Sequence, residues 1–181
     1  MIQSPAQLSR LQQVSLVLLR TLIGWHFLYE GYFKLLRPAW TRAGAPLAGW
    51  TSADYLNAAS GPLAWIFRAA AGSSWLPWID TAVAAALVAV GLLLILGLYT
   101  QAACTGALLL LALFYLSAIP TRGLPEPRNE GAYLLVNKNL VEAIAVLVVL
   151  AFRTGRIAGL DRLRAHDRNR SAPLRTDEAL V

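Results

Sequence analysis

The sequence contains little charge, and one long stretch contains none. Charged residues make up 14% of the 181 residues and hydrophobic residues make up 57%, whereas soluble chains have about 25% and roughly 45–50%. No charged residue lies between Thr81 and Thr121. A water-soluble domain of this length cannot bury so much apolar surface, so the composition predicts a membrane protein.

Residues that build redox and metal centres are equally scarce. Cys104 is the single cysteine, which excludes an intrachain disulfide and a Cys-x-x-Cys dithiol mechanism carried by this chain alone. The histidines are His26 and His166, and His166 lies in a polar tail, which excludes a bis-histidine haem within the chain. No cluster has metal-ligand spacing, and no glycine-rich nucleotide motif is present. We therefore expect no haem, metal or nucleotide cofactor.

Positive charge gathers at the C-terminus. Seven arginines and four acidic residues lie from Arg153 onward, and the formal net charge of the chain is +6. A basic tail is typical of proteins that bind nucleic acid or an anionic membrane surface. Because the rest of the sequence is so apolar, we interpret the basic tail as facing an anionic membrane surface and expect no nucleic-acid partner. Arg10 and the tail hold eight of the sixteen basic residues, which predicts a bacterial inner-membrane protein with both termini in the cytoplasm.

Four apolar segments are candidates to cross the roughly 30 Å hydrocarbon layer, which takes about twenty helical residues. The predicted spans are residues 14–36, 79–98, 102–119 and 132–152. We therefore predict an all-α fold, a polytopic membrane four-helix bundle. It forms a single transmembrane domain over residues 1–163, followed by a polar, flexible tail over residues 164–181.

The long connection between the first two predicted spans, residues 37–78, holds five of the six tryptophans. Tryptophan prefers the headgroup layer, where its ring is buried and its N–H stays hydrated. Thr51 or Ser52 is placed to cap one short helix, and Pro62 is placed to start another that runs to Arg68. The pattern predicts short interfacial helices that cover the outer end of the bundle.

The first span carries four ionisable side chains, Arg20, His26, Glu30 and Lys34. At about 100° per residue the last three advance by about 40° each time, and Arg20 falls within about 40° of Lys34. All four therefore occupy one stripe, which is roughly 120° wide.

The fourth span carries Lys138 and Glu142, which are four residues apart and share a face. A charge at the bilayer centre costs about 2.5–3.5 kcal/mol, so we expect the six side chains to face inward and satisfy one another. With the two spans antiparallel, Glu30 lies near the level of Lys138 and His26 near that of Glu142. Arg20 is expected to reach toward Glu142. The pattern thus predicts one interlocked cluster.

This cluster has two meanings that the residues leave open. Charges buried between helices can hold two helices in one register. Alternatively they line a polar cavity that binds a ligand or moves protons, because ionisable residues at membrane depth mark functional sites. Histidine favours the second meaning, since it titrates near neutral pH.

Several segments resemble the DoxX/DoxD-like membrane proteins: LIGWHFLYEGYFKLL, the Gly-Leu-Tyr-Thr turn, VNKNLVEA and GRIAGLDRL. The resemblance runs over roughly residues 16–163 and implies a four-helix membrane fold. It also implies a link to the membrane subunit of thiosulfate:quinone oxidoreductase, which passes electrons from thiosulfate to a membrane quinone beside a small partner subunit. The positions that match the polar pattern of the family are Arg20, His26, Glu30, Lys34, Asn137, Lys138 and Glu142.

The leading hypothesis is therefore a quinone-linked redox membrane subunit. Three residues are the candidates for proton exchange and catalysis, namely His26, Glu30 and Glu142. Four are the candidates for binding the quinone head group, namely Arg20, Lys34, Asn137 and Lys138. The expected cofactor is quinone, and the expected partners are membrane lipids and a redox subunit or larger membrane complex.

Two alternatives belong to other classes. The chain is a non-catalytic accessory or structural subunit if the charges only hold the bundle together and the tryptophan-rich segment is a docking surface. It is a small-solute or lipid-binding protein if the same cavity serves binding without redox chemistry.

Overall fold

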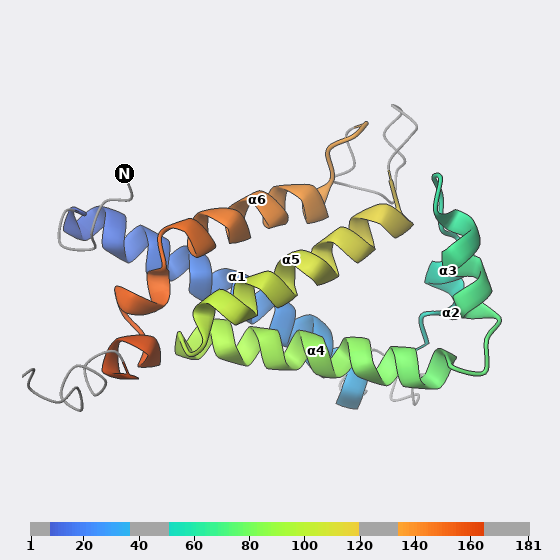
Figure 1. The fold of residues 1–181 in the computed structure, drawn as a ribbon, viewed down its shortest axis with the longest axis horizontal. Coiled ribbons are helices and arrows are strands. Elements are labelled where there is room, and N and C mark those ends of the chain that lie inside the picture. Colours follow the sequence, from blue (N-terminus) through green and yellow to red (C-terminus); the bar gives the residue numbers. More distant parts are fainter. Residues whose placement is uncertain (1–7, 37–50, 120–133, 165–181) are drawn as a thin grey trace, which may run out of the picture.

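The computed structural model describes residues 8–36, 51–119 and 134–164, and every regular element in these ranges is a helix (Figure 1). The elements are α1 (Arg10–Leu36), α2 (Ala53–Asn57), α3 (Ala64–Ala71), α4 (Leu76–Leu96), α5 (Thr100–Ser117), α6 (Lys138–Ala151) and the 3-10 turn η2 (Thr154–Arg156). The all-α prediction is confirmed for this part of the chain. The predictions for residues 132–133, for Trp40 and Trp50, and for the tail after Arg164 lie outside the described residues.

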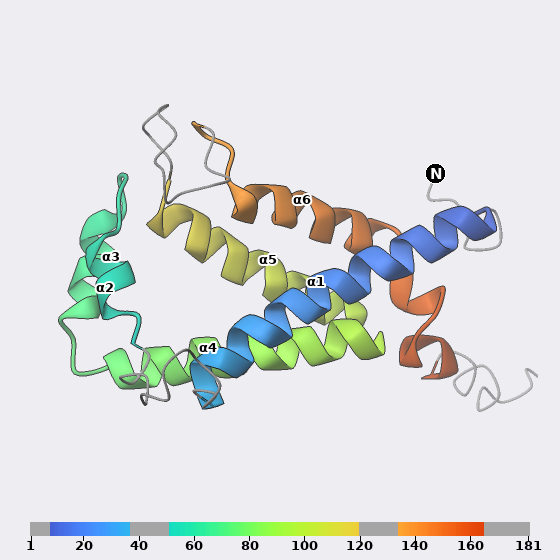
Figure 2. The same cartoon turned by 180° about the vertical axis from the view of Figure 1, so that it is seen from behind.

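The long helices α1, α4, α5 and α6 pack against one another, and successive long helices run in opposite directions (Figures 1 and 2). At one end α1 and α5 begin and α4 and α6 finish. We call it the basic end, after the exposed Arg153, Arg156, Arg162 and Arg164. We call the opposite end the tryptophan end, after the exposed Trp65, Trp75 and Trp78.

Two of the described helices, α4 and α5, are long and apolar enough to cross a membrane. They correspond to the predicted second and third spans, each displaced two or three residues toward the N-terminus. The reason lies in the turn between them: Gly97 has φ 62°, a left-handed conformation that glycine adopts without steric cost. The left-handed Gly97 therefore ends α4 at Leu96, before the predicted boundary. α1 is longer still, but ionisable side chains interrupt its apolar sequence.

The fourth predicted span begins later than expected. Residues 134–137 are not helical, and α6 starts at Lys138. Asn137 is the N-cap, and its side-chain oxygen accepts a hydrogen bond from the Leu140 N–H at 3.0 Å. With 14 residues, α6 is about 21 Å long, shorter than the hydrocarbon layer. A capping asparagine thus fixes the helix start inside a segment whose composition predicted continuous helix.

The short helices α2 and α3 lie across the tryptophan end, steeply inclined to the long helices (Figures 1 and 2), and occupy the segment where short helices were predicted. The start of α2 does not have the expected cause, a side-chain cap by Ser52. The Ser52 side chain does not cap α2; it donates a hydrogen bond to the carboxylate of Asp80 on α4. The Tyr55 hydroxyl donates to the Phe114 carbonyl at 3.1 Å. These bonds tie α2 to the ends of both α4 and α5.

The contact between α1 and α4 is a contact between backbones. Gly24 and Gly91 face each other, so that a Cβ built on Gly91 would lie 2.4 Å from the Leu28 nitrogen and 2.7 Å from the Gly24 carbonyl oxygen. About two turns further along α1, a Cβ on Gly31 would lie 2.7 Å from the Val88 nitrogen. Small residues permit this approach, which is common between helices in membranes.

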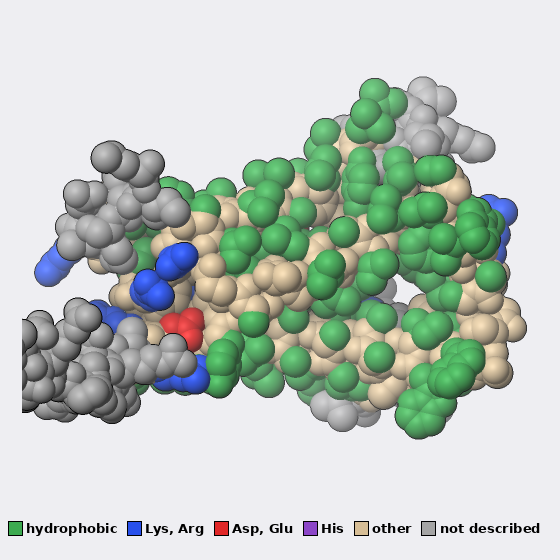
Figure 3. Space-filling view, viewed as in Figure 1, with side chains coloured by type: hydrophobic (Ala, Val, Ile, Leu, Met, Phe, Trp, Pro, Cys, Tyr) green, Lys and Arg blue, Asp and Glu red, His purple; other side chains and the backbone are tan. Residues whose placement is uncertain are grey.

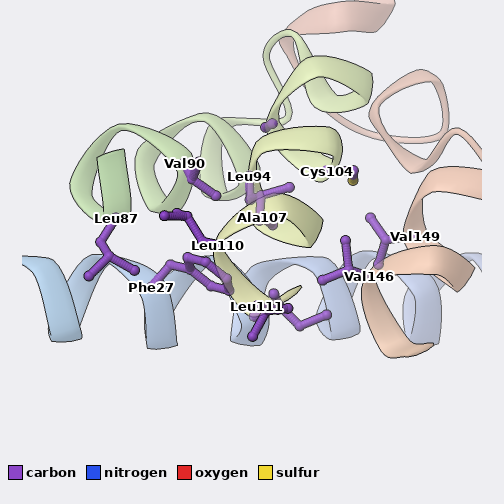
Figure 4. Close-up of a cluster of buried hydrophobic side chains, with 12 residues drawn as sticks. Phe27, Leu87, Val90, Leu94, Cys104, Ala107, Leu110, Leu111, Val146 and Val149 are labelled. Carbon is purple, nitrogen blue, oxygen red and sulfur yellow. The ribbon is translucent and has the colours of Figure 1, made fainter. Parts of the chain in front are cut away.

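The hydrophobic core lies where the four long helices meet (Figure 4). Phe27 of α1, Leu87 and Leu94 of α4, Leu110 of α5 and Val146 of α6 all point into it (Figure 4). The single cysteine, also in this core, is fully buried on α5, as a small apolar packing residue would be. The core therefore includes side chains from every long helix, and α1 contributes Ile23 and Phe27.

We predict that Gly91→Ala lowers stability by about 1–3 kcal/mol, the usual cost of overpacking, because the added methyl meets backbone that cannot rotate away. Thermal unfolding of the detergent-solubilised protein measures the change. Gly106→Ala is the matched control, since a Cβ there meets only the end of the Val90 side chain, at 3.3 Å. Equal losses in the two variants would contradict the close α1–α4 contact.

Candidate functional site

His26 of α1 and Glu142 of α6 form a direct side-chain pair. The imidazole Nδ1 lies 2.7 Å from the carboxylate Oε1. The His26 side chain is 44% exposed, whereas that of Glu142 is 13% exposed. The antiparallel arrangement predicted from the levels of the two residues is thus present. Because the carboxylate occupies Nδ1, the second ring nitrogen, Nε2, remains for another partner, and no other described residue bonds the ring.

An exposed row of aromatic rings lies next to His26 on α1. Trp25 and Tyr29 have ring centroids 6.3 Å apart, and Tyr29 and Phe33 have centroids 4.4 Å apart. Their four-residue spacing places them on one face of the helix. Trp25 and Tyr29 are both exposed. The titratable pair therefore borders a surface that offers flat, apolar contacts.

Glu30 and Lys34 pair with each other along α1. The Lys34 ammonium donates to the Glu30 carboxylate, four residues before it, an orientation that suits a helix. Lys138 at the start of α6 lies within electrostatic reach of both Glu30 and His26. Five of the six predicted cluster members therefore gather where α1 meets α6. The prediction that they face inward is wrong for His26 and Lys138, which are exposed, because the face of α1 that points into the core carries Ile23 and Phe27 instead. Asn137 lies at the same place, but its amide oxygen caps α6.

Arg20 does not join this cluster, which corrects the prediction that it reaches toward Glu142. Its side chain is buried at the basic end, only 3% exposed. A Cβ on Gly97 would lie 2.9 Å from the Arg20 Nη1, and the charge that acts on the guanidinium comes from Asp161. The physical reason is direction: helical side chains lean toward the N-terminus of their helix, so Arg20 extends away from Glu142.

Asp161 is a structurally important residue that the sequence analysis did not single out. Its carboxylate accepts hydrogen bonds from the Tyr99 and Thr100 amides, each at 2.8 Å, and its own N–H donates to the Gly97 carbonyl at 2.9 Å. Tyr99, the N-cap residue of α5, makes no side-chain cap bond. The carboxylate of Asp161, 61 residues away from Thr100 in the sequence, caps the helix instead. The absence of a capping side chain at this turn was the available signal.

Glycines make the approach of Asp161 possible. A Cβ on Gly155 would lie 2.2 Å from the Thr100 hydroxyl oxygen and 2.5 Å from a carboxylate oxygen of Asp161. Gly159 lies against Gly97, where a Cβ would be 2.8 Å from the carbonyl oxygen. The GRIAGLDRL segment therefore docks on the α4–α5 turn through backbone and carboxylate contacts.

The geometry divides the predicted site residues into two places. His26, Glu30, Lys34, Lys138 and Glu142 lie together between α1 and α6, with Asn137 beside them as a helix cap. Arg20 lies at the basic end with Asp161. Among the described residues no three histidine, cysteine or acidic side chains are grouped to hold a metal ion. Comparison of the chain with family models, curated proteins and solved structures finds no match.

A double-mutant cycle tests the His26–Glu142 pair. We expect the combined effect of His26→Gln and Glu142→Gln on unfolding free energy to depart from the sum of the single effects by about 0.5–3 kcal/mol, as for side chains in contact. A control cycle pairs His26→Gln with Asp80→Asn, since Asp80 bonds Ser52 at the tryptophan end. There the effects should add within about 0.5 kcal/mol. Additivity in both cycles would refute the pair.

The pH dependence of stability tests the role of Asp161. Burial raises the pKa of this carboxyl, but the Thr100 and Tyr99 amides and the charge of Arg164 outweigh burial and hold the pKa below its ordinary value of 3.8. An acid with a lowered pKa stabilises the fold while ionised, and this stability disappears as the pH falls through the folded-state pKa.

We therefore expect Asp161→Asn to reduce unfolding free energy at pH 7 by about 0.5–2 kcal/mol, the usual value of a helix cap. The difference from the wild type should shrink as the pH falls below 3.8. Asp54→Asn, at an exposed position of α2, controls for the loss of one negative charge. A difference that persists unchanged at low pH would contradict the capping role.

Proposed function

We propose that the chain is a four-span protein of the bacterial inner membrane and of the DoxX/DoxD-like type, with its basic end in the cytoplasm. The apolar, uncharged α4 and α5 support this placement. So does the long hydrophobic surface between the two ends (Figure 3), which fits the hydrocarbon layer. Exposed leucines along α1 and exposed Val141, Ile144 and Leu147 along α6 extend that surface to the other two spans.

We propose further that the protein is a quinone-linked redox subunit, similar in chemistry to the membrane subunit of thiosulfate:quinone oxidoreductase. The observation that carries this proposal is the His26–Glu142 pair: a titratable dyad held at 2.7 Å, yet with nearly half of the imidazole accessible. A pair that served only to join two helices gains nothing from that exposure, whereas a proton-exchanging group requires it.

The dyad has the geometry of a proton-exchanging pair. Glu142 holds the Nδ1 side of the ring, fixes the ring orientation and stabilises the imidazolium form. The Nε2 side is then the position from which a proton passes to an oxygen of a bound molecule. A quinone bound here would supply the oxygen atoms and would accept two electrons and two protons, and a partner redox subunit would supply the electrons.

The neighbouring residues have matching roles in this proposal. The aromatic row of Trp25, Tyr29 and Phe33 offers a face for the flat quinone ring. Lys138 places a positive charge near the dyad, which favours negative charge on a ring oxygen. Glu30 and Lys34 pair along α1 and neutralise each other's charge. Arg20, which lies elsewhere, has no part in this site.

A non-catalytic accessory subunit is the second candidate, and a separate observation favours it. Trp65, Trp75 and Trp78 are each about 70% exposed at the tryptophan end. Trp65 lies on α3, whose residues are all at least partly exposed. Tryptophan is enriched at protein interfaces as well as at membrane surfaces. In this case the His26–Glu142 pair serves only to align α1 with α6.

The test is quinone binding and reduction by the detergent-solubilised protein. We expect a quinone to co-purify, as detected by mass spectrometry, and a soluble quinone to be reduced when thiosulfate and a partner subunit are supplied. Glu142→Gln should lower the rate of reduction by about 10²–10⁴-fold, the range for loss of an acid–base group. Asp80→Asn at the tryptophan end is the control and should leave the rate unchanged.

The two candidates give opposite results in this test. If folded protein binds no quinone and Glu142→Gln leaves all measured properties except stability unchanged, the accessory role stands and the redox role is refuted.

A further inference from the structure

Three arginines at the basic end project from a short segment directly after α6. Arg153, Arg156 and Arg162 are exposed, and Figure 3 shows Lys and Arg side chains gathered at this end of the molecule. No described residue accepts a hydrogen bond from any of the three side chains. Because α6 ends at Ala151, the arginines lie where a membrane-crossing helix leaves the hydrocarbon layer.

The one negative charge of this segment already has hydrogen-bond partners. Asp161 is the only acidic residue among residues 152–164, and its carboxylate accepts hydrogen bonds from the two amides of the α4–α5 turn. Arg164 lies over the Tyr99 ring, 4.1 Å from its centroid, and its charge also acts on Asp161. Among the described residues, no acidic side chain forms an ion pair with the remaining three arginines.

The backbone of the segment is also held in place, so that the three arginines start from fixed positions. Thr154, Gly155 and Ile157 are buried, and the Arg156 N–H donates to the Arg153 carbonyl at 2.9 Å. Arg153 and Arg156 are thus one tight hydrogen-bonded turn apart. Two arginines that start three residues apart on one backbone turn suit a phosphate, because each guanidinium can donate two hydrogen bonds to its oxygens.

Apolar side chains accompany the arginines. Phe152, Leu160 and Leu163 are exposed in the same segment. A surface that binds a soluble phosphate or a nucleic acid gains nothing from them, whereas the boundary between headgroups and acyl chains accommodates both kinds of side chain. The combination therefore favours a lipid over a water-soluble anion.

We propose that Arg153, Arg156 and Arg162 form a binding site for the headgroup phosphate of an anionic phospholipid, with Phe152, Leu160 and Leu163 against its acyl chains. The site rests on the membrane placement proposed above and is independent of the quinone chemistry. It lies at the end of the bundle opposite to α2 and α3, and it uses none of the residues around His26.

Lipid titration of the full-length protein in mild detergent, followed by native mass spectrometry, tests the site. We expect phosphatidylglycerol to bind in preference to phosphatidylcholine. Each arginine near an anionic surface contributes about fivefold in affinity. The double variant Arg153→Gln/Arg156→Gln should therefore bind phosphatidylglycerol about 20- to 30-fold more weakly, with phosphatidylcholine binding unchanged.

Two controls separate this site from general positive charge. Arg68→Gln removes an exposed arginine of α3, at the tryptophan end, and should leave phosphatidylglycerol binding unchanged. Arg153→Lys/Arg156→Lys keeps the charge but loses the paired donors, and should fall between the wild type and the double glutamine variant. If the double glutamine variant does not fold, the single variants Arg153→Gln and Arg156→Gln should each show about a fivefold loss.

Several results would overturn the proposal. They are equal binding of the two lipids, an equal loss in Arg68→Gln, displacement of phosphatidylglycerol by millimolar inorganic phosphate, and tight binding of a short RNA in its place. A protein that remains monodisperse in buffer without detergent would refute the membrane placement itself. A detergent-dependent protein without lipid preference would refute only the headgroup site.

Discussion

Backbone contact between α1 and α4 determines where every ionisable group of α1 lies. Because Gly24 and Gly91 let the two helices touch without intervening side chains, the rotation of α1 about its axis has little freedom. That rotation places Phe27 in the core, His26 at the α6 boundary and Arg20 against the α4–α5 turn. A larger residue at either glycine would separate the helices and shift all three. The polar chemistry of the molecule thus depends on an apolar contact made by residues that have no side chain.

The polar groups form two sites, one partly exposed and one buried. Between α1 and α6 the charges are paired and partly accessible, as the exposed imidazole of His26 shows. At the basic end the Arg20 guanidinium is sealed, and its Nε and Nη1 have no hydrogen-bond partner among the described residues. A buried charge is costly unless it is paired, and buried water often satisfies such groups. Only the first site gives an outside molecule a route to a titratable atom.

Sequence periodicity predicted which side chains share a helix face, but neither the burial of that face nor the reach of individual side chains. Of the six side chains expected to face inward only Arg20 is buried, and His26 and Lys138 are exposed. The contact between His26 and Glu142 was predicted because each lies in the polar stripe of its helix and the two residues lie at the same level when the helices are antiparallel. The same wheel placed Arg20 on the right face. It could not show that a long side chain leans toward the N-terminus of its helix, which carries Arg20 to a different site. Asn137 likewise matched the polar pattern of the family and was a candidate for quinone binding. Because it directly precedes the first residue of α6, its side chain caps that helix.

Contacts that join distant segments were out of reach for the sequence analysis. Asp161 and the α4–α5 turn lie about sixty residues apart, and neither segment signals the other by periodicity. The bond has a consequence for the order in which the chain is assembled. During synthesis the α4–α5 hairpin emerges first, and the leading amides of α5 have no protein acceptor until Asp161 has been translated. The segment that follows α6 therefore completes the hairpin last, so the basic end can close only after all four long helices have been synthesised.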